Sequence, residues 1–466
     1  FDAPSPNGSG AYAGLTATAY DARRGVAPEQ HLAAPRFWRY PESSRRLGVL
    51  SVGTGDVATP LGRGRVDASL GAYQGALTIE SFTARDYGTL AARELGDERS
   101  ATGRVTAEHS IPGLPRALQG ARVRVGATTA EVRYDETLDA QRPTARPVRY
   151  RQRLTSVGTE ADLPLGARVL VSGGVVRDAA VSPESGGRPP LGALAHWGWR
   201  VGATASVGDA VRVHGAASRR ARFPALRELY SGALARFDPN PALRPERLLA
   251  FEAGATVVGD AAARRGLTLQ GVAFHHRLDD AVVRVTLPNR LFRRVNRDAI
   301  RSTGVELLAG WAPASLGGVS FTGDLLAQRV RVSDVTLPAG EPNERRPEHQ
   351  PELRGSLDVA LPLPFGVRGS ALARYTGRQF CQHPDLGRQV ALGGQGAADA
   401  ALSRGWTLGA GTRGAGTRGA ARALGGRLLR TLRATVALDN LTDATVYDQC
   451  GLPQPGRTLR VGVEVR

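Results

Sequence analysis

The chain has 466 residues, a formal net charge of +18, 58 glycines, 29 prolines and only 6% aromatic residues. It contains no run of about 20 apolar residues, which excludes a transmembrane helix. Apart from histidine, every basic residue is an arginine, and these arginines are spread along the whole chain. Such a spread argues against a nucleic-acid-binding segment, which would gather them on one stretch.

Alternation of apolar and polar residues with a period of two is the main pattern along the chain, and it predicts β-strands. The final segment is typical, because Leu459, Val461 and Val463 alternate with Arg460 and Gly462. In chain order the pattern predicts about 18 strands, at residues 9–20, 44–54, 62–73, 100–110, 118–134, 148–162, 166–180, 192–206, 210–220, 248–258, 265–278, 298–311, 316–331, 354–362, 366–377, 390–403, 430–439 and 457–466.

Several arginines alternate with small apolar residues on these strands, namely Arg122, Arg124, Arg200, Arg433 and Arg460. An arginine that faces lipid at mid-membrane depth costs roughly 2–4 kcal/mol, whereas one inside a water-filled barrel stays hydrated. We therefore predict that all five face the lumen. Their charge favours anionic solutes there, unless carboxylates such as Glu131, Asp439 and Glu464 pair with them.

Short and long connections alternate along the chain. Short ones lie at 55–61, 111–117, 163–165, 207–209, 259–264, 312–315 and 363–365, and long ones at 21–43, 74–99, 135–147, 181–191, 221–247, 279–297, 332–353, 378–389 and 440–456. Outer-membrane barrels have short periplasmic turns and long extracellular loops, and a soluble β-sandwich has no reason to keep this order. The segment 404–429 is the one exception, because it is long where a short turn is expected.

These observations predict an all-β fold, a closed antiparallel transmembrane β-barrel in a bacterial outer membrane. Closure follows because an open strand edge in lipid leaves unpaired backbone groups, each costing roughly several kcal/mol. We expect residues 1–466 to form a single barrel domain and the protein to be a monomer.

The two cysteines, Cys381 and Cys450, fall in two long connections that are separated by one hairpin. Both connections belong to the extracellular set, and export implies an oxidising compartment. We predict a disulfide between them.

Motifs of catalysis or metal binding are weak in this chain. The segment from Gly409 to Gly414 matches a dinucleotide-binding pattern, but that pattern has meaning only between a strand and a helix, and no helical periodicity follows it. His275 and His276 are neighbours on a predicted strand, so they point to opposite faces and cannot chelate one ion together. We expect no enzyme activity, no catalytic residue, no cofactor and no resident metal.

The second half of the chain resembles TonB-dependent receptors. The run from Arg222 to Tyr230, Arg-Phe-Pro-Ala-Leu-Arg-Glu-Leu-Tyr, is similar to a phenylalanine-proline-x-leucine-x-glutamate-leucine-tyrosine segment of that family. The run from Asn240 to Glu246 is similar to its asparagine-proline-x-leucine-x-proline-glutamate motif. Further similarities follow in order, at Glu252 and Gly254, at Asn296 with Ser302 to Glu306, at Asn440 to Asp443 and at Pro455 to Arg457.

The resemblance implies a receptor that imports a scarce nutrient, a ferric siderophore or another metal chelate first among them, with energy supplied through TonB. In that family a plug domain sits inside a barrel of 22 strands, so this chain lacks a recognisable plug and about four strands, and the contact with TonB cannot be mapped on it. Polar and aromatic side chains of the long loops are the candidate substrate contacts: Tyr230, Arg236, Phe237, Tyr375 and His383. The alternative is a passive pore or an adhesive barrel that has no plug.

Overall fold

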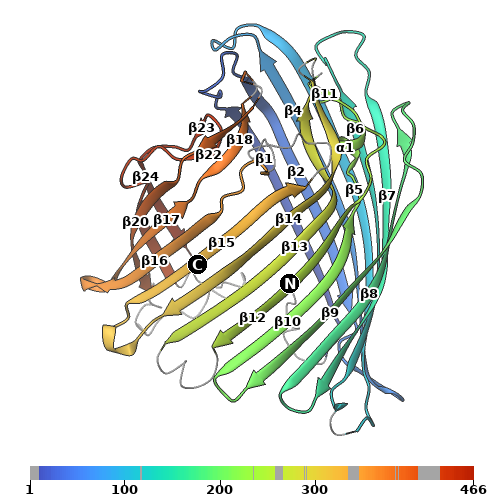
Figure 1. Cartoon of the computed structure of the whole chain (residues 1–466), viewed down its shortest axis with the longest axis vertical. Coiled ribbons are helices and arrows are strands. Elements are labelled where there is room, and N and C mark those ends of the chain that lie inside the picture. The colour runs from blue at the N-terminus through green and yellow to red at the C-terminus, as the bar shows by residue number, and fades with distance from the viewer. Residues whose placement is uncertain are drawn as a thin grey trace, which may run out of the picture.

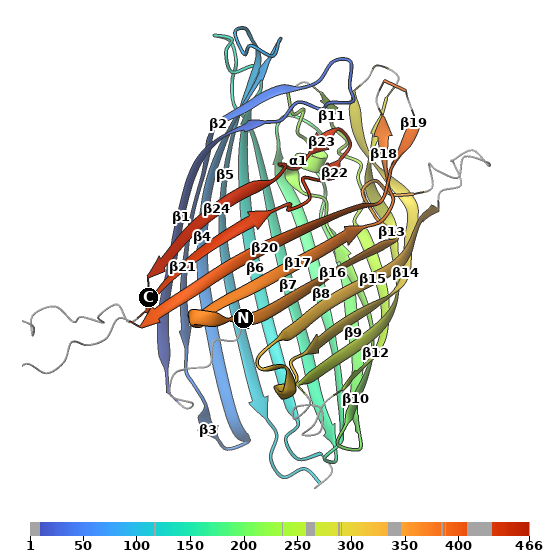
Figure 2. The same cartoon turned by 90° about the vertical axis from the view of Figure 1, so that its left-hand side faces the viewer.

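A computed structural model describes residues 10–465 except 116–117, 235, 258–265, 288, 290, 334–345, 384, 387 and 408–430. Its main element is one curved antiparallel wall in which long strands pair with their neighbours in chain order. Figures 1 and 2 show this wall bent round into a barrel. The long strands are β1 (Tyr12–Val26), β2 (Phe37–Gly53), β4 (Gly62–Phe82), β5 (Leu90–Ser110), β6 (Arg122–Thr137), β7 (Val148–Leu165), β8 (Val169–Ser185), β9 (Leu194–Val207), β10 (Val211–Arg222), β12 (Glu246–Val257), β13 (Leu267–Thr286), β14 (Phe292–Trp311), β15 (Ser320–Ser333), β16 (Leu353–Leu363), β17 (Val367–Thr376), β20 (Gln395–Thr407), β21 (Thr431–Asp439) and β24 (Thr458–Val465).

Short elements lie almost entirely at one end of the barrel, the end that carries the long connections (Figure 1). They are the helix α1 (Leu226–Leu229) and the strands β11 (Phe237–Asp238), β18 (Gln379–His383), β19 (Arg388–Leu392), β22 (Tyr447–Gln449) and β23 (Leu452–Pro453). At the opposite end, β3 (Val57–Thr59) and two single 3-10 turns, Ala314–Leu316 and Pro364–Gly366, belong to short connections. The alternation of short and long connections therefore separates the two ends, as the sequence predicts. The unusual segment 404–429 lies mostly outside the described residues.

Each predicted strand overlaps one long strand of the wall, but several observed strands continue further toward the loop end. The clearest case is the predicted loop 74–99, most of which is the end of β4 and the start of β5, with a connection of only 83–89. In this extension polar residues occur on both faces, for example at Glu80, Arg93 and Glu94. Where a strand leaves the membrane, no lipid demands an apolar face, so the alternation that marks the strand disappears.

The two faces of the wall differ in character, and the cross-strand register follows each face round the barrel. Leu15 pairs with Leu50 and Leu50 with Leu70, and the same face continues through Val105. Large apolar side chains on this face are strongly exposed, with Leu70 at 66% and Val461 at 72% of their surface. Such exposure is stable only against lipid, so this is the outer face. Among the described residues, no helix has the length and apolar character needed to cross a membrane.

The opposite, inner face carries the arginines predicted for the lumen. Each points to the opposite face from the exposed apolar residues of its own strand, as Arg200 does between Trp199 and Val201. They are ion-paired rather than free, and Arg124 lies 2.6 Å from Glu108. The other pairs are Arg122 with Glu108, Arg200 with Glu160, Arg433 with Glu464, and Arg460 with Asp439. Neutralisation by local pairing thus limits the positive field of the lumen, although Glu131 takes no part because it lies on the outer face.

Candidate functional site

A cavity of about 440 Å³ opens at the loop end of the barrel, between strand ends and the folded connections. Its lining combines three kinds of side chain. The arginines are Arg36, Arg227, Arg236, Arg284 and Arg294. The glutamates are Glu29, Glu94 and Glu348, and the aromatic residues are Trp38, Phe237 and Phe292. These residues are far apart in sequence, so only the curved wall and the folded loops bring them together.

Three of the cavity arginines are held by carboxylates. Arg36 forms an ion pair with Glu29. A guanidinium nitrogen of Arg227 lies 3.0 Å from a carboxylate oxygen of Glu94, and one of Arg284 lies 3.3 Å from a carboxylate oxygen of Glu348. These ion pairs hold the arginine side chains in place, and they also neutralise the charge of all three glutamates. The remaining positive charge of the cavity therefore belongs to Arg236 and Arg294.

Arg236 and Arg294 form no ion pair with any residue that the structure describes. The guanidinium of Arg236 lies 5.2 Å from the ring centre of Phe292, and that of Arg294 lies 4.5 Å from the ring centre of Phe237. Burial, together with the neighbouring Arg36, lowers the pKa of Arg236. A guanidinium remains charged nonetheless, so the cavity holds two cations that lie against aromatic rings and have donors left for an anion.

The two histidines of the lining, His31 and His349, add no charge near neutral pH. Burial lowers the pKa of both side chains from its usual value, and for His31 the nearby His383 lowers it further. The His31 and His383 rings meet edge to face with centres 4.8 Å apart. The positive character of the cavity therefore depends on its arginines.

The connection 223–245 supplies Arg227, Arg236 and Phe237, and it is anchored by a small buried core. Leu226, Leu229 and Tyr230 of α1 and its C-terminus are almost completely buried, with Leu243 beside them. Tyr230 stacks on Tyr150 with ring centres 5.7 Å apart, and Tyr150 in turn stacks on Tyr134 of the wall. The apolar positions of the Phe-Pro-Ala-Leu-Arg-Glu-Leu-Tyr segment thus attach the connection to the inside of the barrel.

Two buried carboxylates of the wall complete this attachment. Glu94 accepts hydrogen bonds from the Leu234 amide at 2.7 Å and from Arg227 at 3.0 Å. Glu136 accepts one from the Ser231 hydroxyl. Buried carboxylates are stable only when such donors satisfy them, so the wall and the connection depend on each other.

The second family-like motif holds the other end of the same connection. Asn240 donates to the Arg294 carbonyl at 2.9 Å, and Asn296 accepts from the Arg244 amide at 2.9 Å. Arg244 also pairs with Asp280 at 2.5 Å. These asparagines tie the connection to β13 and β14, so they position Arg294 beside Phe237 and are not themselves ligand contacts.

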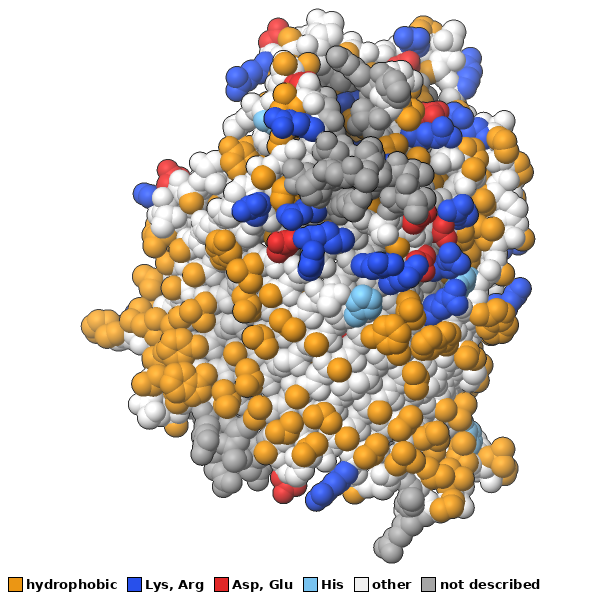
Figure 3. Space-filling model, viewed as in Figure 1, with side chains coloured by type: hydrophobic (Ala, Val, Ile, Leu, Met, Phe, Trp, Pro, Cys, Tyr) orange, Lys and Arg blue, Asp and Glu red, His pale blue; other side chains and the backbone are white. Residues whose placement is uncertain are grey.

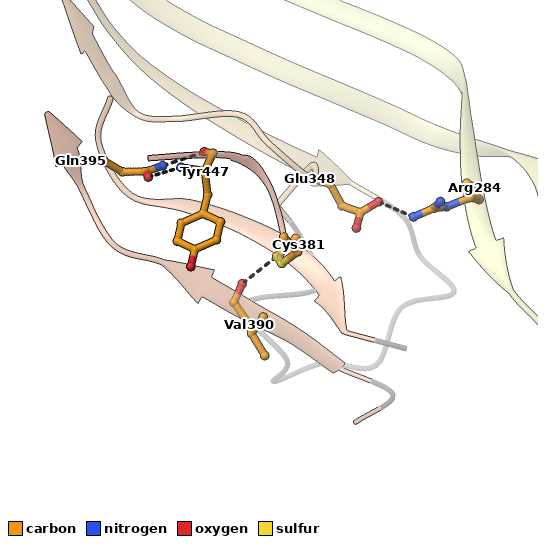
Figure 4. The surroundings of a disulfide bond; sticks show 7 residues. Arg284, Glu348, Cys381, Val390, Gln395 and Tyr447 are labelled. Carbon is orange, nitrogen blue, oxygen red and sulfur yellow. Dashed lines mark hydrogen bonds and ion pairs between the residues drawn. A yellow bond between two sulfur atoms is a disulfide. The ribbon is translucent and has the colours of Figure 1, made fainter. Parts of the chain in front are cut away.

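Cys381 and Cys450 are joined by a disulfide, which links β18 to the turn between β22 and β23. Figure 4 shows the bridge beside the Arg284–Glu348 ion pair. Both cysteines line the cavity, and Cys381 is 1% exposed. The bridge therefore fixes one wall of the cavity.

Replacing both Cys381 and Cys450 by serine is expected to loosen this wall without unfolding the barrel, because the strands on either side remain paired. We expect faster proteolysis within 378–389 and 440–456, and an unchanged mobility shift between heated and unheated protein on a denaturing gel. Unchanged proteolysis in the serine variant would show that the bridge does not stabilise the cavity wall.

The structure distributes the other predicted contact residues unevenly. Arg236 and Phe237 line the cavity, and His383 borders it through His31. Tyr230 is fully buried, and its hydroxyl accepts a hydrogen bond from the Leu191 amide, so its contacts are with protein. Tyr375 lines a different groove and is 47% exposed.

Sequence reasoning missed several lining residues, above all Arg284 and Arg294. Both lie in the predicted loop 279–297 but belong to strand ends, and no local pattern distinguishes them from other arginines. Arg227 could have been chosen from the sequence, because it lies inside the first family-like motif.

Among the described residues, no group of three or more His, Cys, Asp or Glu side chains could hold a metal ion. His275 faces Thr303 and His276 faces Glu252, on opposite sides of β13. The segment from Gly409 to Gly414 lies outside the described residues.

Comparison with known proteins identifies relatives of the whole wall. A family model described as TonB dependent receptor-like, beta-barrel, matches residues 8–441. No curated protein matches the sequence. Among solved structures, the copper transporter OprC is 14% identical to this chain with a TM-score of 0.72, and the match covers 97% of this chain and 69% of the OprC chain.

Two further structures are similar at the level of fold. The siderophore receptor PiuA from Acinetobacter baumannii is 11% identical with a TM-score of 0.71, covering 99% of this chain and 72% of its own. The ferric-catecholate import receptor Fiu from E. coli K12 is 12% identical with a TM-score of 0.66, covering 97% of this chain and 71% of its own. At such identities the likeness concerns the fold alone.

Proposed function

The chain belongs to the TonB-dependent receptor β-barrel family, and from this membership we propose that it imports an anionic metal chelate, a ferric siderophore first among them, across the bacterial outer membrane. Members of the family are transporters rather than enzymes. In this proposal residues 1–466 supply the barrel, which acts as a monomer in outer-membrane lipid. Energy comes from TonB through a plug domain that sits inside the barrel.

The observation that carries the proposal is the pair of cavity arginines that form no ion pair with any described residue. Arg236 and Arg294 lie against aromatic rings and have donors unused by carboxylates. Ferric chelates built on catecholate or carboxylate groups bring both negative charge and flat aromatic or chelate surfaces. Charge-assisted hydrogen bonds from arginine to oxygen anions are among the stronger ones, and cation–π contacts favour a fixed guanidinium plane.

The relatives support the same substrate class. Two of the similar structures are described as a siderophore receptor and a ferric-catecholate import receptor, and another as a copper transporter. Iron chelates are therefore the first choice and other metal chelates the second.

Growth on defined iron sources tests the proposal. Iron-starved cells that carry the receptor gene should grow on at least one anionic ferric chelate, and deletion of either the receptor or TonB should abolish that growth. Growth that needs the receptor but not TonB would instead identify a passive pore.

A further inference from the structure

The outer wall carries rows of arginines that oppose one another directly across neighbouring strands. Arg99 of β5 faces Arg133 of β6, which faces Arg151 of β7. A second row repeats the arrangement, because Arg277 of β13 faces Arg301 of β14, which faces Arg331 of β15. By register, both rows lie on the face of the exposed apolar residues, not on that of the lumen. Figure 3 shows basic side chains spread across the outer wall above a broad apolar surface.

Like charges that face each other directly across strands destabilise a sheet, and acidic residues neutralise these rows only in part. In the first row Glu131 contacts Arg133 and Glu184 contacts Arg151, and in the second row Asp279 contacts Arg277 and Glu352 contacts Arg331.

At and beside the two rows, four outward-facing arginines have no ion pair or hydrogen-bond partner among the described residues: Arg99 in the first row with Arg46 beside it, and Arg301 in the second row with Arg329 beside it. Their guanidinium groups therefore have hydrogen-bond donors left for anions from outside the chain.

The height of the rows fixes which anions can reach them. Trp311 and Arg301 are both on the outer face of β14 and are ten residues apart. At roughly 3.3 Å per residue and a tilt of about 45°, that separation spans about 23 Å along the membrane normal, close to the apolar band of about 25 Å in such barrels. Trp311 marks the interface at the short-turn end, so the arginines lie at the headgroup level of the leaflet at the loop end.

Below each row the outer wall is hollowed. A groove of about 750 Å³ lies under the first row, where Ala17, Ala19, Gly48, Ala72 and Ala101 leave room between larger neighbours, and Arg46, Arg99 and Arg133 form its upper edge. A groove of about 560 Å³ lies under the second row, lined by Ala253, Ala273, Val305 and Ala327. Small apolar residues beneath cationic ones provide space for an acyl chain below an anionic headgroup.

We propose that the outer wall holds two phosphate-bearing lipids of the outer leaflet, one on each arginine row. Phosphate oxygens accept paired hydrogen bonds from the guanidinium groups, and the acyl chains occupy the grooves below. Basic clusters next to an apolar surface recognise anionic headgroups in this way. The imported chelate cannot be the ligand here, because these side chains face away from the lumen. The proposal does not depend on the substrate of the receptor.

Native mass spectrometry of the full chain in detergent, titrated with diphosphorylated lipid A, tests this inference. The unmodified chain should bind two lipids. The variant with Arg46→Gln and Arg99→Gln should lose one of them, and so should the variant with Arg301→Gln and Arg329→Gln, each with at least a tenfold weaker affinity at the altered site. These four arginines were chosen because removing them leaves no carboxylate unpaired.

Arg404→Gln is the matched control, because Arg404 lies on the outer face toward the short-turn end, against Trp406. It should bind two lipids. Dephosphorylated lipid A should bind the unmodified chain at least tenfold more weakly, a comparison that needs no folded variant. Equal binding of the two lipids, two lipids on both double variants, or displacement of the lipid by inorganic phosphate alone would overturn the proposal.

Discussion

Replacing Arg236 and Arg294 together by alanine is expected to lower the affinity for the ferric chelate by about 100-fold or more. Hydrogen bonds to charged groups contribute roughly 1.5–3 kcal/mol each, and every 1.4 kcal/mol is a factor of about ten. Both side chains lie against aromatic rings and have no carboxylate partner in the described structure. Removing them therefore leaves no carboxylate without its ion-pair partner, and the ion pairs of the cavity stay intact.

Quenching of tryptophan fluorescence by the ferric chelate is a direct measure of this affinity, because Trp38 lines the cavity. The matched control replaces Arg146 and Arg188, two exposed loop arginines, by alanine. It removes the same charge and should leave the dissociation constant within about threefold. An equal loss in both double variants would mean that overall charge, not this cavity, attracts the ligand.

Replacing Tyr230 by alanine is expected to release the connection 223–245 from the wall. Loss of a buried aromatic side chain costs roughly 3–5 kcal/mol, and Tyr230 has no exposed surface. Because Arg227, Arg236 and Phe237 are held by this connection, ligand affinity should fall with it. Tyr230→Phe keeps the stack on Tyr150 but leaves the Leu191 amide unpaired, so a smaller loss of roughly 1–3 kcal/mol is expected.

Hydrogen exchange of the backbone amides in 223–245 is the measurement for this prediction. Exchange should be faster in Tyr230→Ala and intermediate in Tyr230→Phe. Tyr375→Ala, which removes a half-exposed tyrosine elsewhere, should leave it unchanged. Unchanged exchange in Tyr230→Ala would show that the buried stack does not anchor the connection.

The wall could be predicted from sequence because lipid on one side and water on the other impose a period of two on every strand. The final strand shows this clearly, since Leu459, Val461 and Val463 are exposed to lipid while Arg460 pairs with Asp439 inside. The same cause explains the failure at the loop end. Beyond the membrane the constraint vanishes, so the outer parts of β4 and β5 looked like a loop, and β18, β22 and β23 were not predicted.

Only some of the residues that line the candidate site could be predicted from the sequence. Arg236 and Phe237 stood out because they are adjacent in a long loop, and they do line the cavity. Arg284 and Arg294 could not be chosen, because their proximity depends on how two strand ends meet across the loop 287–291. Tyr230 illustrates a different difficulty, since a conspicuous aromatic residue in a loop motif serves to pack the loop.

Energised uptake of an anionic ferric chelate through the arginine-lined cavity is tested most directly by the initial rate at which iron-starved cells take up a chelate labelled with radioactive iron. We predict rapid uptake in cells with the unmodified receptor, and a rate at background when TonB is deleted or when Arg236 and Arg294 are both alanine. Uptake that persists at the unmodified rate in either strain would contradict the account.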